Sequence, residues 1–60
     1  MFKFATIENG ACILYTRQKN GICWRKPIME ERAVQISAAD FKAAHLSALS
    51  RIKIYYERKR

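Results

Sequence analysis

Three segments of the chain alternate between apolar and polar residues: 2–8, 11–19 and 22–27. Such alternation is typical of strands whose two faces meet different surroundings. Two Asn-Gly dipeptides, Asn9-Gly10 and Asn20-Gly21, separate these segments. Asn-Gly suits a two-residue hairpin turn, because both turn positions need positive φ. The pattern therefore predicts a three-stranded antiparallel meander.

Two-residue turns would also set the register of the strands. They pair Phe4 with Tyr15 and Arg17 with Trp24, and paired residues share a face. One face then carries most large side chains: Phe2, Phe4, Ile13, Tyr15, Ile22 and Trp24. The other face carries smaller apolar side chains: Ala5, Ile7, Cys12, Leu14 and Cys23. We expect the aromatic face to be the core, since aromatic side chains bury the most area. A shift of one residue would exchange the faces.

The sheet is expected to end near Pro27, which cannot donate a ladder hydrogen bond. Residues 28–36 are ambiguous, because residues 30–35 could also start a helix; we favour a connection or a short extra strand at 33–36. A helix is predicted from Ser37 to the end of the chain, with Ser37 as N-cap and Asp40 in the first turn. Its apolar stripe recurs at helical spacing: Phe41, Ala44, His45, Ala48, Ile52 and Tyr55. The predicted fold class is α+β, with residues 1–27 as sheet and 37–60 as one helix packed on it.

The chain has 60 residues, which is enough for a single domain, 1–60, with a marginal core. Lys and Arg number 12 against 5 Asp and Glu, a formal net charge of +7. The basic residues concentrate in 1–29 and 51–60, which favours a polyanionic partner, although charge of this size also serves solubility. No segment resembles a signal peptide or a run of about 20 apolar residues. We expect a cytoplasmic protein without a membrane span and with reduced thiols.

Catalysis and metal binding find little support in the sequence. Cys12, Cys23 and His45 provide three ligands without the close pair that a structural zinc site uses. His45 lies on the apolar stripe, where an interior histidine is the favoured interpretation. The serines and cysteines form no nucleophile motif, and Glu30 and Glu31 would point apart. We expect a non-enzymatic protein without metal, cofactor or small-molecule substrate.

Basic residues provide the better functional signal. Four of them surround Tyr15 and Trp24 on the second hairpin: Arg17, Lys19, Arg25 and Lys26. Three more on the last helical turns complete the predicted nucleic-acid-binding set: Arg51, Arg58 and Lys59. A two-stranded ribbon fits the major groove of DNA, and aromatic side chains among cations can instead stack on single-stranded bases. The alternative is that the aromatics are core and the cations only solvate its rim.

The hairpin ILYTRQKNGICWRK and the helix after Ser37 resemble, in outline, the N-terminal arm-site DNA-binding domains of phage-type tyrosine integrases. The resemblance covers residues 11–55 and lies in the order of strand, basic turn, strand and helix. It implies a phage-like accessory or regulatory DNA-binding factor, because the resemblance includes no catalytic integrase domain.

A second hypothesis is a protein-interaction module, such as an inhibitor of a larger host or phage protein, or a homodimer. The helix has more apolar residues than one sheet face needs, and the predicted interaction surface is Leu46, Leu49 and Tyr56. A third is binding to an anionic membrane surface through the basic amphipathic helix.

Overall fold

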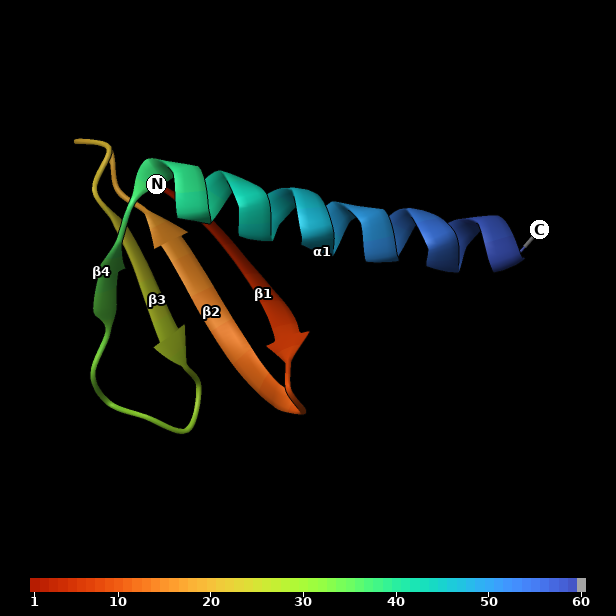
Figure 1. Cartoon of the computed structure of the whole chain (residues 1–60), viewed down its shortest axis with the longest axis horizontal. Coiled ribbons are helices and arrows are strands. Elements are labelled where there is room, and N and C mark those ends of the chain that lie inside the picture. The colour runs from red at the N-terminus through yellow and green to blue at the C-terminus, as the bar shows by residue number, and fades with distance from the viewer. Residues whose placement is uncertain (60) are drawn as a thin grey trace.

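The computed structural model describes residues 1–59 of the chain, and the side chains of residues 1–51. Its elements follow one another along the chain as β1 (Phe2–Glu8), β2 (Ala11–Arg17), β3 (Cys23–Pro27), β4 (Val34–Ile36) and α1 (Ala38–Lys59). The strands form one antiparallel sheet in the order β1-β2-β3-β4. Helix α1 crosses the end of the sheet where the N-terminus lies, and its C-terminal half extends beyond it (Figure 1). The predicted α+β class is confirmed.

The sheet has four strands, so the prediction of three was wrong. The fourth strand, β4, is the short segment that the sequence left between a connection and a strand. Its pairing aligns Cys23 with Ile36 and Arg25 with Val34. Val34 and Ile36 are β-branched, which suits a strand, and their backbone groups give β3 a hydrogen-bonding partner that the three-stranded sheet would lack.

The first hairpin is as predicted. Asn9 and Gly10 have φ of 50° and 80°, as a two-residue turn with two left-handed positions requires. The strands consequently pair Glu8 with Ala11 and Phe4 with Tyr15.

The second Asn-Gly makes a different turn, and the register predicted there was wrong by one residue. Only Gly21 has a positive φ, of 89°. Its N–H donates to the carbonyl of Gln18 at 2.9 Å, and the N–H of Ile22 donates to Asn20 Oδ1 at 3.0 Å. The result is a β-turn followed by a glycine bulge, the three-residue type of hairpin loop.

Because of that bulge, Arg17 pairs with Cys23 instead of Trp24, and β2 ends at Arg17 instead of residue 19. Every side chain of β3 changes face relative to the prediction. Cys23 points to the helix and is 1% exposed, whereas Trp24 lies on the opposite face beside Thr16. Cys12 and Cys23, expected on one face, therefore lie on opposite faces.

The core lies between α1 and the face of the sheet that it covers. Four buried residues form its centre: Ile13, Tyr15, Cys23 and Phe41. Phe4 stacks on Tyr15 with ring centroids 4.9 Å apart, and Phe41 meets the Phe4 ring edge-on at 5.3 Å. Tyr15 and Phe4 thus belong to the core, as predicted, whereas Phe2 remains 44% exposed and Trp24 lies on the other face.

Helix α1 begins as the sequence predicts. The N–H of Asp40 donates to Ser37 Oγ at 3.0 Å, the hydrogen bond of an N-cap. Among the helix residues whose side chains are described, Phe41 and Ala48 are buried, one turn and three turns into the helix. Within the described chain, no helix combines the length and the apolar composition that a membrane crossing needs.

Candidate functional site

One face of the sheet is left uncovered, because α1 packs on the other (Figure 1). We call this surface the open face. Side-chain alternation and the observed register place nine residues on it: Lys3, Ala5, Ile7, Cys12, Leu14, Thr16, Trp24, Lys26 and Gln35. Its cations are Lys3 and Lys26, and none of the nine is a carboxylate. The open face therefore combines apolar area with positive charge only.

A shallow pocket of about 340 Å³ lies on the open face, lined by Leu14, Thr16, Trp24, Lys26 and Ala33. The register creates it, because Trp24 pairs with Thr16 and Lys26 pairs with Leu14 on the neighbouring strand. Lys26 Nζ donates to the carbonyl of Glu30 at 2.8 Å, which holds the ammonium close to the pocket rim. The arrangement offers a flat aromatic surface with a cation beside it.

Lys3 belongs to the same part of the open face. It pairs with Thr16, and Thr16 pairs with Trp24, so the three residues form one row across β1, β2 and β3. Neighbouring strands lie about 4.8 Å apart, which puts the Cα atoms of Lys3 and Trp24 roughly 10 Å apart. Lys26 lies two residues along β3 from Trp24 and on the same face. Trp24 thus has one lysine next to it on its own strand and a second lysine two strands away in the same row.

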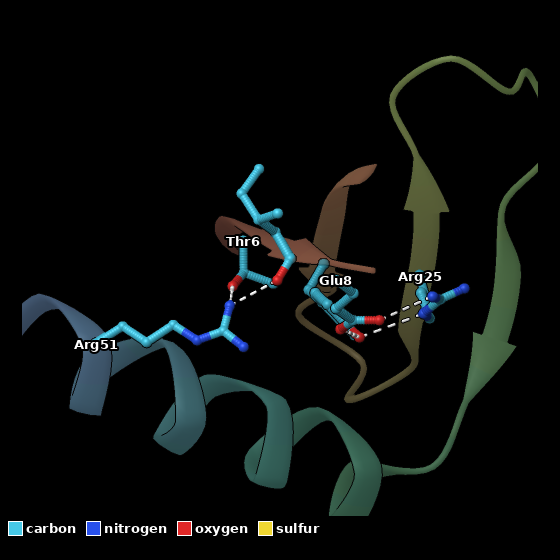
Figure 2. Close-up of polar contacts among 6 residues, drawn as sticks. Thr6, Glu8, Arg25 and Arg51 are labelled. Atoms are coloured by element: carbon cyan, nitrogen blue, oxygen red, sulfur yellow. Dashed lines mark hydrogen bonds and ion pairs between the residues drawn. The ribbon is translucent and has the colours of Figure 1, made fainter. Parts of the chain in front are cut away.

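Arg25 points the other way, toward the helix side, and is held by two partners there (Figure 2). Its Nη2 forms an ion pair with Glu8 Oε1 at 2.8 Å, and its Nε donates to the Tyr15 hydroxyl at 3.3 Å. The Tyr15 hydroxyl in turn donates to Glu8. The guanidinium that was expected to contact nucleic acid therefore joins β1, β2 and β3 on the helix side of the sheet, where it stays partly exposed.

The three side chains shift one another's ionisation. Two hydrogen bonds hold the pKa of Glu8 below its ordinary value of 4.5, and the one from Tyr15 has a larger effect than the one from Arg25. The pKa of Tyr15 is raised above its ordinary value of 10.0, mainly by burial and to a smaller extent by the hydrogen bond to the Glu8 carboxylate. At neutral pH the cluster is thus an ionised Glu8–Arg25 pair bridged by a neutral phenol.

The lowered pKa makes stability depend on pH in a defined direction. A carboxyl with a depressed folded-state pKa stabilises the fold above its unfolded value and loses this effect as the pH falls through the folded value. We expect Glu8→Gln to lower the free energy of unfolding at pH 7 by at most about 1 kcal/mol, since the pair is partly exposed. The difference from wild type should close as the pH falls below 4.5.

Urea unfolding followed by circular dichroism at several pH values would measure this. Glu31→Gln, on the exposed loop before β4, is the matched control and should show no such pH-dependent gap. An equal gap for both variants at pH 7, or a gap that persists at low pH, would contradict the role of Glu8.

Arg51 is also used within the fold (Figure 2). Its Nη1 donates to the carbonyl of Ile7 at 2.6 Å and to Thr6 Oγ1 at 3.4 Å. These contacts connect the fourth turn of α1 to β1, far from Trp24 on the opposite face. Arg51 therefore lies apart from the open face.

The remaining predicted cations are dispersed. Arg17 is exposed at the end of β2, and Lys19 is exposed in the second turn. Arg58 and Lys59 lie outside the residues whose side chains are described. The predicted hairpin set is thus divided, with Lys26 on the open face and Arg25 on the helix side. Sequence reasoning missed Lys3, Leu14, Thr16 and Ala33, because they join Trp24 only in the register that the glycine bulge produces.

The predicted interaction surface is partly described. Leu46 and Leu49 are 56% and 46% exposed, while the Tyr56 side chain lies outside the described residues. Within the described part of the chain, no three His, Cys, Asp or Glu side chains come together as metal ligands would. His45 packs against Phe2 and Phe4, with ring centroids 4.9 and 5.1 Å apart.

The fold defines a small α+β domain in which a four-stranded antiparallel meander carries one helix on one face and leaves the other face open. No protein-family model, curated protein or solved structure matches this chain.

Proposed function

We propose that this protein binds single-stranded nucleic acid on the open face of its sheet, as an accessory or regulatory factor without catalytic activity. The observation that carries the proposal is that Trp24 lies on the open face beside Lys26, in the same cross-strand row as Lys3, and that none of the nine residues of this face is a carboxylate. In this proposal a base stacks on the indole, and the two ammonium groups contact the flanking phosphates. Aromatic stacking accepts any base, so binding would show little sequence preference.

A single strand suits this surface better than a duplex. A base inside a duplex hides its faces in the stack, whereas an unpaired base can lie flat on an aromatic side chain. The duplex-binding alternative needs cations along both edges of the second hairpin, and Arg25 is turned to Glu8 and Tyr15 on the helix side.

The fluorescence of Trp24 tests the proposal directly, because this is the single tryptophan of the chain. We expect an oligothymidylate to quench the emission saturably, with RNA of the same length acting similarly and a duplex acting weakly. The observed affinity should fall as salt rises, since each phosphate contact releases counterions. Absence of both quenching and filter retention at low salt, for DNA and RNA alike, would refute the proposal.

Self-association is the second candidate function, and exposed Leu46 and Leu49 on α1 favour it. A second copy of the chain is the proposed partner, because a domain of this size has a marginal core and often gains stability by oligomerising. Sedimentation at increasing concentration should show dimers that a Leu46→Ser, Leu49→Ser double variant lacks. A monomer at all concentrations would remove this candidate.

A further inference from the structure

A second and larger cavity opens on the other side of the sheet, where the start of β1 and the end of β2 meet the first turns of α1. Its volume is about 590 Å³, and it is lined by Phe2, Arg17, Ala38, Phe41, Lys42 and His45. Pockets of about 300–1,000 Å³ are typical of sites for small organic ligands. The proposed nucleic-acid surface makes no use of this cavity, since Trp24 lies on the opposite face.

The polar side chains that line the cavity are all basic and present nitrogen atoms. Arg17 comes from β2, whereas Lys42 and His45 lie one turn apart on α1. In the part of the chain whose side chains are described, these three groups make no hydrogen bond or ion pair with another residue, unlike Arg25 and Arg51. No carboxylate lines the cavity. Its donors are thus available to an anion, and guanidinium and ammonium groups are the usual phosphate binders.

An aromatic wall stands beside these cations. Phe2 pairs with Arg17 across the strands and remains 44% exposed, although its ring lies 4.9 Å from His45 and 6.0 Å from Phe41 between ring centroids. A bare phosphate would leave this ring and most of the volume unused. A ligand that fills the cavity needs an anionic group for Arg17 and Lys42 and a planar ring for Phe2.

We propose that this cavity binds a nucleotide, with its phosphate between Arg17 and Lys42 and its base against Phe2. His45 contributes a ring nitrogen that can hydrogen-bond to the sugar or the phosphate. The nucleotide is either free or one unit of a strand, since the recognising chemistry is the same. The site is separate from the open face and does not depend on nucleic-acid binding there.

Nuclear magnetic resonance titration of the labelled full chain tests this, with adenosine monophosphate, adenosine, inorganic phosphate and an oligothymidylate as separate probes. We expect adenosine monophosphate to shift the signals of Arg17, Lys42 and His45 while Trp24 emission stays constant. Adenosine and inorganic phosphate should each bind at least roughly tenfold more weakly, because each lacks one of the two contacts. Shifts at these residues with the oligothymidylate alone would assign the site to a nucleotide within a strand.

The variants Arg17→Gln and Lys42→Gln should each weaken binding by roughly tenfold, the loss of one charge-assisted contact at a partly solvated site. Both side chains are exposed, so the fold should persist, and circular dichroism would verify this. Arg32→Gln, which removes the same charge from the exposed loop before β4, is the matched control.

Three results would overturn the site. The first is the absence of shifts at the cavity with every probe. The second is equal weakening by Arg32→Gln, which would mean general charge attraction. The third is inorganic phosphate binding as tightly as adenosine monophosphate, which would mean that the base makes no contact. Quenching of Trp24 by the oligothymidylate would still support the open face in each case, so the two proposals fail separately.

Discussion

Phe41→Ala is expected to remove a large part of the stability of the protein. Phe41 is 4% exposed, and it is the aromatic side chain of α1 in the buried cluster, where it meets the rings of Phe4 and Tyr15. Replacing a buried Phe by Ala costs about 3–5 kcal/mol. A domain of 60 residues has a total stability of about 3–9 kcal/mol, from about 0.05–0.15 kcal/mol per residue. The substitution therefore removes a large part of the stability, and at the lower end all of it.

Urea unfolding monitored by circular dichroism measures this loss. Met29→Ala is the matched control, because it also shortens a large apolar side chain but at a position that is 95% exposed. We expect the control to change the free energy of unfolding by about 0.5 kcal/mol or less. If the two variants unfold at similar urea concentrations, the core does not depend on Phe41 as the structure indicates.

Trp24→Ala is expected to weaken binding of single-stranded nucleic acid by about 5–150-fold, from a stacking contribution of about 1–3 kcal/mol per base. Trp24 lies on the open face outside the buried cluster, so the variant should keep the fold. Trp24→Phe should retain most of the affinity, because a phenyl ring still stacks. Anisotropy of a labelled oligonucleotide provides the measurement, since these variants lack the tryptophan signal.

Lys26→Gln gives the electrostatic counterpart of the same prediction. It should weaken binding to all sequences alike. The slope of log affinity against log salt concentration should fall by about 1, the value for one lost phosphate contact. Arg32→Gln removes an equal charge elsewhere and should leave both the slope and the affinity nearly unchanged. Unchanged binding by Trp24→Ala, or an equal effect of Arg32→Gln and Lys26→Gln, would show that the strand does not lie across the open face.

The positive charge of the chain serves more than one purpose in this structure. Arg25 and Arg51 hold the sheet together and attach the helix to β1, whereas Lys3, Lys26, Arg17 and Lys42 lie on surfaces that a ligand can reach. A formal charge of +7 therefore overstates the surface available to a polyanion. Sequence alone cannot separate the two groups, because an arginine in a strand has the same local pattern in either role.

The sequence by itself determined the first hairpin and the start of the helix, because both depend on residues that are close together in the chain. Asn9-Gly10 specified a tight turn and with it the register of β1 and β2. Ser37 and the stripe that includes Phe41 specified where α1 begins and which side it buries. These features follow from backbone preferences and from periodicity, which act over a few residues.

Only the tertiary structure decided the register of β3, the pairing of β4 and the division of the basic residues. The dipeptide Asn20-Gly21 permits both a two-residue turn and a bulged loop, and distant contacts choose between them. The bulge puts the small Cys23 beneath Phe41 and brings Arg25 to Glu8 and Tyr15. It also turns Trp24 to the open face, because a shift of one residue reverses every side chain of a strand.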